Sequence, residues 1–164
     1  MGENNWMKVR ADLLQEMRNN PQLYITVMGA VEYQSMLHAV GYDGIGSATR
    51  DRWLQLPEMG HVIATAYNCV VHTLGLTMSL TFFPLLTAPV PINNRRVIIL
   101  GHVGVHFVIP TLSPDCPLPP ASSRWEECHL TVADGWPAAY EDRMRRFKAM
   151  VGHTMSTVEV HELS

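Results

Sequence analysis

The sequence predicts one domain of mixed α/β class, in which helices flank a β-sheet. Two patterns predict this class: apolar residues three or four apart, as on one face of a helix, and short runs of β-branched and aliphatic residues, as in strands. The chain has 164 residues, 47% of them hydrophobic and 16% charged, enough for one core but not for two comfortable ones. We place the domain at residues 1–151 and expect a loose tail over 152–164, where no period is visible.

Two helices are predicted in the first forty residues. The first is capped by Asn5 and stopped by Pro21. Its apolar residues recur three or four apart: Trp6, Val9, Leu13 and Met17. The second covers residues 29–40 and stops at Gly41. Its inward-facing residues are predicted to be Val31, Met36, Leu37 and Val40.

Two further helices begin at prolines. Pro57 opens a helix with Glu58 in its first turn, where the negative charge suits the helix dipole. Its apolar stripe consists of Met59, Val62, Ile63, Ala66 and Tyr67. Asn68 is predicted to end it in a left-handed conformation. Pro137 opens the last helix, with apolar residues at Tyr140, Met144, Phe147 and Val151.

The strands are predicted in the middle of the chain. Residues 69–74 form a strand ended by Gly75, and residues 79–85 form a short strand that Pro84 places at an edge. Residues 97–100 and 105–112 are two apolar runs that fold back on each other through Gly101 and Gly104. The continuous run at 97–100 suggests a strand covered on both faces, at or near the centre of the sheet. The four prolines in residues 113–123 predict an extended segment that wraps the surface.

His106 is the candidate catalytic residue of this hairpin. It enters a strand predicted to be buried, beside a glycine turn. Such a histidine sits at a sheet edge, where side chains commonly meet a substrate. Pattern alone favours a different interpretation, in which His106 is a structural residue whose hydrogen bonds are satisfied in the core or at a turn.

Composition argues against several classes of partner. The formal charge is −3, and the cluster of Arg143, Arg145, Arg146 and Lys148 is read as a solvated helix face, so nucleic acid is not expected. The most apolar region, residues 62–86, is interrupted by polar residues, which argues against a membrane span. Three widely spaced cysteines predict a reducing compartment, hence an intracellular protein of the cytoplasm or nucleus. The oligomeric state is left open.

No cofactor or metal site is predicted. Cys69 is interpreted as a core residue, while Cys116 and Cys128 fall in or just after the proline-rich segment. Cys69 and His72 have a ligand-like spacing, but positions three apart on a strand face opposite sides. The glycine-rich loop at residues 43–47 lacks the lysine of a phosphate-binding loop and follows a helix.

The order of several short motifs along the chain resembles one protein family. The motifs are Trp6, Val9-Arg10, Leu13-Leu14, Arg52-Trp53, Pro57-Glu58-Met59-Gly60, Ile63-Ala64, Tyr67-Asn68, Thr81-Phe82-Phe83-Pro84-Leu85, His106-Phe107-Val108, Pro117-Leu118-Pro119-Pro120 and Trp125. This series is similar to the OTU-like cysteine peptidase domains, in particular the divergent branch that accompanies plant Mutator-like transposable elements. The resemblance covers residues 6–147. It implies a fold of the papain-like cysteine peptidase superfamily, a mixed sheet flanked by helices.

The resemblance assigns a role to His106 and leaves the nucleophile unassigned. The family's general base is a histidine on a late strand followed by an aromatic residue, which His106 and Phe107 match. Its nucleophilic cysteine lies in an Asp-Gly-x-x-Cys segment at the start of an N-terminal helix, which has no counterpart here. Asp43 and Ser47 have a similar spacing but follow two helices, so the role is not transferred to Ser47. Many active members place an acid or amide shortly after the histidine, where this chain has Val108.

The resemblance therefore implies a deubiquitinase-like domain that lacks its N-terminal catalytic helix and has no peptidase activity as given. Ubiquitin or a ubiquitin-like protein is the implied partner. Two alternatives stay open: a noncatalytic module that binds a ubiquitin-like or other protein surface, and an upstream exon that supplies the cysteine.

Overall fold

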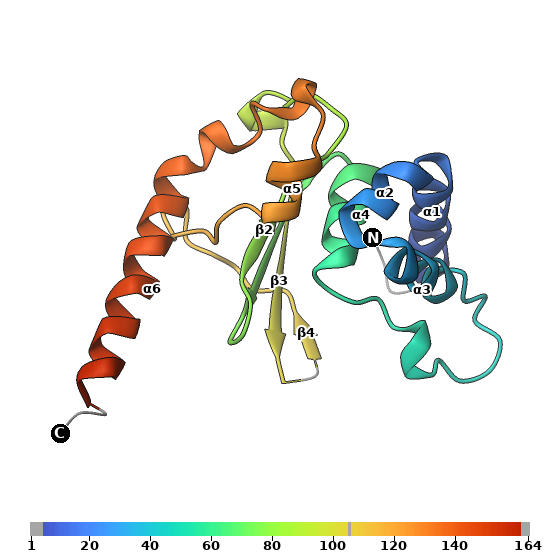
Figure 1. Cartoon of the computed structure of the whole chain (residues 1–164), viewed down its shortest axis with the longest axis horizontal. Coiled ribbons are helices and arrows are strands. Elements are labelled where there is room, and N and C mark those ends of the chain that lie inside the picture. The colour runs from blue at the N-terminus through green and yellow to red at the C-terminus, as the bar shows by residue number, and fades with distance from the viewer. Residues whose placement is uncertain (1–4, 105, 162–164) are drawn as a thin grey trace.

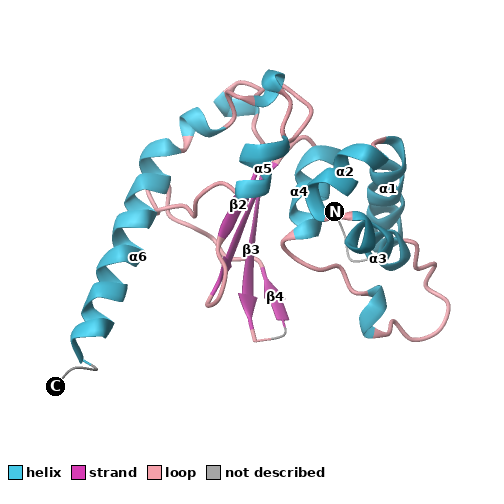
Figure 2. Ribbon diagram, in the orientation of Figure 1, coloured by secondary structure: helices cyan, strands magenta, loops and turns pink. Residues whose placement is uncertain are grey.

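A computed structural model describes residues 5–104 and 106–161. It has a mixed α/β architecture, as the sequence predicted: a four-stranded mixed sheet with helices on both sides (Figures 1 and 2). The helices α1 (Trp6–Asn19), α2 (Pro21–Met28), α3 (Ala30–Val40) and α4 (Glu58–Ala66) form a group on one side of the sheet, and the long helix α6 (Glu141–His161) lies on the other.

The sheet has the strand order β2-β1-β3-β4. Its strands are β1 (Val70–Gly75), β2 (Leu80–Phe82), β3 (Val97–Val103) and β4 (His106–Val108). The inner strands β1 and β3 are parallel, and each pairs with an antiparallel edge strand. The strand predicted after Asn68 and the edge position of the strand before Pro84 are both confirmed.

The N-terminal helices confirm part of the prediction. α1 ends at Asn19 as expected, although the Asn5 side chain makes no capping hydrogen bond. Pro21 does more than stop α1, because it is the first residue of α2, a helix that the sequence did not predict. Val31 was predicted to face inward but is 86% exposed, and Tyr33 takes the buried position on α3.

Helix α4 follows its predicted apolar stripe, with Met59 and Val62 fully buried. Asn68, just after the helix, has a φ of 45°, which confirms the left-handed turn into β1. Gly60 lets α4 approach the sheet closely, since a Cβ there would stand 2.6 Å from the ring of Phe82.

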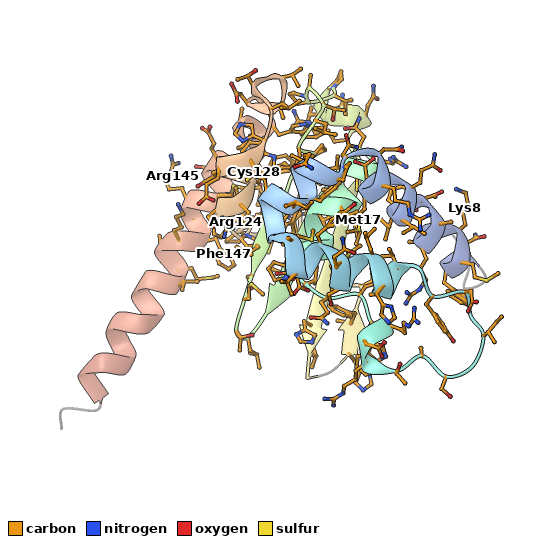
Figure 3. The ribbon with its side chains drawn as sticks, turned by 45° about the vertical axis from the view of Figure 1, so that its right-hand side comes forward. Lys8, Met17, Arg124, Cys128, Arg145 and Phe147 are labelled. Carbon is orange, nitrogen blue, oxygen red and sulfur yellow. The ribbon has the colours of Figure 1, made fainter. Side chains whose placement is uncertain are left out.

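One continuous hydrophobic core joins the helical group, the sheet and the C-terminal segments. Its fully buried members include Leu13, Met17, Tyr24, Met36, Val62, Val70, Phe83, Leu85 and Trp136. Figure 3 shows Met17 within the helical group and Lys8 on the outer side of α1. A second cluster, containing Val71 and Phe82, lies between α4 and the sheet.

The hairpin of β3 and β4 departs from the prediction in two ways. β3 continues through Gly101 to Val103, so of the two predicted turn glycines only Gly104 lies between the strands. Val105, predicted as the first residue of the second run, lies outside the described residues. The expectation that residues 97–100 are covered on both faces is wrong, because Val97 is 45% exposed and the next three residues are half-buried. The reason is that α4 packs against Ile98 and Leu100 on one face only.

The proline-rich segment is extended, as predicted, and protects one edge of the sheet. The Thr81 N–H donates to Pro120 O at 2.7 Å, and the Ser122 N–H donates to Thr81 O at 2.9 Å. Instead of staying on the surface, the segment enters the core at Leu118, which is 1% exposed.

The chain after the short helix α5 (Ser123–Cys128) leads into α6. Pro137 starts a 3-10 turn rather than the helix itself, and α6 continues to His161, past the predicted last apolar position at Val151. No helix in the described part of the chain is long and apolar enough to cross a membrane.

Candidate functional site

His106 is the first residue of β4, where it pairs with Val103 next to the turn. The sheet edge expected for this histidine is confirmed, because β4 is an edge strand. The expectation that its strand is buried is wrong, since all three residues of β4 are exposed. Of the hairpin expected at or near the sheet centre, only β3 is an inner strand. Among the described side chains, those of residues 5–104 and 106–152, no carboxylate or amide is hydrogen-bonded to its ring. The structure thus places this imidazole in solvent, without a described group that orients it.

The face on which His106 lies follows from the strand register. Cross-strand partners share a face, so His106 lies with Val103, and Val108 lies over Gly101. A Cβ on Gly101 would stand 2.7 Å from Val108 Cγ2. Because side chains alternate along a strand, Val97 belongs to the same face. We call Val97, Val103, His106 and Val108 the open face of the hairpin.

The open face is apolar and uncovered in the described structure. Val97 is 45% exposed, Val103 63% and Val108 45%. Farther along the same side of the sheet, Val70 and His72 of β1 are buried under the core that includes Tyr140. Coverage therefore stops between β1 and the hairpin. In Figure 1 the hairpin projects below α5, between α6 and the helical group.

Cys69 has the properties of a core residue and not of a nucleophile. It is 1% exposed, and its Sγ lies 3.9 Å from Ile63 O. Burial raises the pKa of its thiol to about 11. It precedes Val70, which pairs with Val97 at the start of β3, whereas His106 pairs with Val103 at the end of that strand. The length of β3 separates the two by roughly 20 Å.

The other two thiols make no hydrogen bond to His106 either. Burial, together with the charge of Glu127, raises the pKa of Cys128. Cys128 is the last residue of α5, which lies in the upper half of Figure 1, whereas the hairpin lies at the lower end. Figure 3 labels Cys128 in the upper half of the molecule. The Sγ of Cys116 contacts Pro117 O at 3.4 Å, and its carbonyl accepts a hydrogen bond from Arg143 Nε.

Two histidines are buried in the core: His61, which sequence reasoning missed, and His72, which it considered only as a metal ligand with Cys69. His72 Nδ1 lies 2.8 Å from Thr81 Oγ1, and that hydroxyl donates its only hydrogen to Pro119 O at 2.7 Å. The hydroxyl must therefore accept from His72, which fixes the Nδ1–H tautomer. His61 Nε2 lies 3.1 Å from Ser122 Oγ, and its Nδ1 has no partner in the described structure. Both rings are fully enclosed, so we assign them to the core.

The structure also separates His102 from His106, four residues apart in the sequence. His102 pairs with Phe107, so its ring lies on the opposite face of the hairpin from His106. Within the described ranges no cluster of three or more His, Cys, Asp or Glu side chains is placed to hold a metal ion.

The comparisons with known proteins do not assign a family. Neither the protein-family models, nor the curated proteins, nor the solved structures contain a match to this chain.

Proposed function

We propose that the chain is a catalytically inactive, OTU-like domain that binds a ubiquitin-like protein through the open face of its β3–β4 hairpin. The motif series of residues 6–147 supports the choice of partner, since the domains it resembles act on ubiquitin. The observation that carries the proposal is the exposed apolar face of the hairpin that also bears the one histidine singled out by the resemblance.

The thiols support a noncatalytic role. A cysteine nucleophile acts as the thiolate and needs a neighbouring base to form it. Burial raises the pKa of Cys69 far above neutrality, and none of the described thiols is hydrogen-bonded to His106. His106 on an exposed edge strand is then available for contact with a partner.

The open face has the character of a weak or moderate interaction surface. Covering a half-exposed valine is worth about 1 kcal/mol, so Val97, Val103 and Val108 together would contribute a few kcal/mol to binding. No Asp, Glu, Lys or Arg lies between Arg96 and Asp115, so a partner has no charged group on the hairpin to desolvate.

Titration of fluorescently labelled ubiquitin against the full chain tests the proposal. We expect saturable binding that Val103→Lys weakens by about tenfold, because the lysine places a charge in the apolar contact. The matched control is Val31→Lys, which adds the same charge to an exposed valine on α3 and leaves the affinity unchanged.

Incubation of ubiquitin chains with the purified protein tests the noncatalytic part. We expect the chains to stay intact with wild type and with His106→Ala. Cleavage by wild type that disappears in His106→Ala would refute inactivity, and absence of ubiquitin binding would refute the proposed partner.

A further inference from the structure

A second surface feature lies on the other face of the hairpin. It is a groove of about 490 Å³ between the sheet and the segment that leads into α4. Thr73 of β1 forms part of its floor, His102 and Phe107 form one wall, and Trp53 and Leu56 form the other. Because His102 and Phe107 face away from Val103 and His106, this groove and the open face are separate surfaces.

The walls of the groove present apolar and aromatic surface. Trp53 is 49% exposed, Phe107 51% and Met78 42%. The rings of His102 and Phe107 pack against each other with centroids 5.0 Å apart, and Trp53 Nε1 donates to Ala48 O at 3.3 Å. The aromatic side chains are thus held in place by their own neighbours and still expose half of their surface.

The only full charge among the described residues of the groove is positive. Arg50 is the only lining residue that carries a full charge at neutral pH, and no carboxylate is among the described residues that line it. Arg50 is exposed and has no ion pair within the described structure. Its neighbour Asp51 does not neutralise it, because that carboxylate lies 2.8 Å from His38 Nε2 and 3.5 Å from Arg52 Nε.

We propose that this groove binds a short protein segment in which aliphatic or aromatic residues are flanked by acidic ones. The apolar walls take the hydrophobic side chains, and Arg50 attracts the carboxylates. The half-exposed walls would cover only one side of a bound ligand, and the other side would stay exposed. This suits a segment that belongs to a larger protein partner. Small-molecule pockets, by contrast, bury most of the ligand surface.

Two labelled peptides test the proposal by fluorescence anisotropy with the full chain. Both carry a Leu-Phe-Leu core, flanked in one by two glutamates on each side and in the other by two lysines on each side. We expect the glutamate peptide to bind about tenfold more tightly, because only its flanks complement Arg50. Equal affinities, or no binding of either peptide, would overturn the proposal.

Two arginine variants locate the site. Arg50→Gln should weaken the glutamate peptide severalfold and reduce its advantage over the lysine peptide. Arg18→Gln is the matched control, since it removes the same charge from an exposed position on α1 and should change neither affinity. If Arg18→Gln had the same effect as Arg50→Gln, the attraction would come from net charge and the groove assignment would be wrong.

The proposals for the groove and for the ubiquitin-binding open face can be tested independently of each other. Val103→Lys should weaken ubiquitin binding by about tenfold and leave peptide binding unchanged. Arg50→Gln should weaken binding of the glutamate peptide severalfold and leave ubiquitin binding unchanged. Loss of both activities in either variant would mean that the two surfaces are not separate.

Discussion

His61 and His72 are buried in the core, each within hydrogen-bonding distance of a hydroxyl. Burial lowers the pKa of each ring to about 4, and the nearby charges of Arg124 and Arg143 act in the same direction. Neutral imidazoles of this kind stabilise the fold only while they stay uncharged. His106 differs from both, because its side chain is exposed on the edge of the sheet.

These two histidines predict a loss of stability in mild acid. Their folded-state pKa of about 4 lies below the 6.5 of a free histidine, so the unfolded chain takes up protons first as the pH falls. Their contribution is complete above pH 6.5 and is lost between pH 6.5 and about 4, on the order of 3 kcal/mol for each ring. Urea unfolding at pH 7.5, 6 and 5 measures this loss.

Carboxylates also take up protons as the pH falls, so a variant is needed to show that a buried histidine causes the loss of stability. His61→Gln should be less stable than wild type at pH 7.5, because the glutamine does not reproduce the packing of the ring on Phe82. Its stability should nevertheless fall less between pH 7.5 and 5. A pH dependence identical to that of wild type would show that His61 is not the group that titrates.

At the scale of elements, the position of α4 decides how the sheet is covered. Gly60 brings the helix onto β2 and the second cluster, and α4 covers Ile98 and Leu100 of β3 on that face. In the described part of the chain no helix covers the opposite face of the hairpin in the same way. The groove lies on the face that α4 covers only in part, and the open face lies on the opposite side of the hairpin, away from α4.

Gly60→Ala tests the close contact between α4 and β2. The added Cβ would stand 2.6 Å from the Phe82 ring, so either the ring or the helix must shift. We expect a loss of about 1–3 kcal/mol in the free energy of unfolding. Gly152→Ala is the control, because its Cβ meets nothing within 4 Å in α6 and should leave stability unchanged or slightly raised. Equal effects of the two substitutions would contradict the close contact.

At the scale of the whole molecule, one core connects the N-terminal helices to the C-terminal segments. Met17 of α1 belongs to the same cluster as Phe83, Trp125 and Trp136, which pack on one another through ring contacts. The helical group and the sheet are therefore expected to unfold together.

Met17→Ala tests this coupling. The methionine is fully buried, so the substitution should cost about 2–5 kcal/mol. Because the core is shared, the urea transitions followed by far-ultraviolet circular dichroism and by tryptophan fluorescence should coincide and shift together. Two separate transitions, with only one moved by Met17→Ala, would show that the helices and the sheet are independent units.

Local signals predicted most of the elements correctly. The apolar stripe of α4, the left-handed turn at Asn68 and the edge position of β2 before Pro84 depend on neighbouring residues, so they are readable along the chain. Pro21 was misread because a proline that ends one helix also suits the first position of the next.

The sequence by itself determined the mixed α/β class, the hairpin around Gly104 and the presence of His106 at its turn, since spacing and turn residues act over a few positions. The tertiary structure decided that β4 is exposed rather than buried and that Cys69 lies at the opposite end of the sheet from His106. It also brought Arg50, Trp53 and Phe107 to one groove. These contacts join residues far apart in the chain, and their geometry depends on how α4 packs on the sheet, which no local pattern encodes.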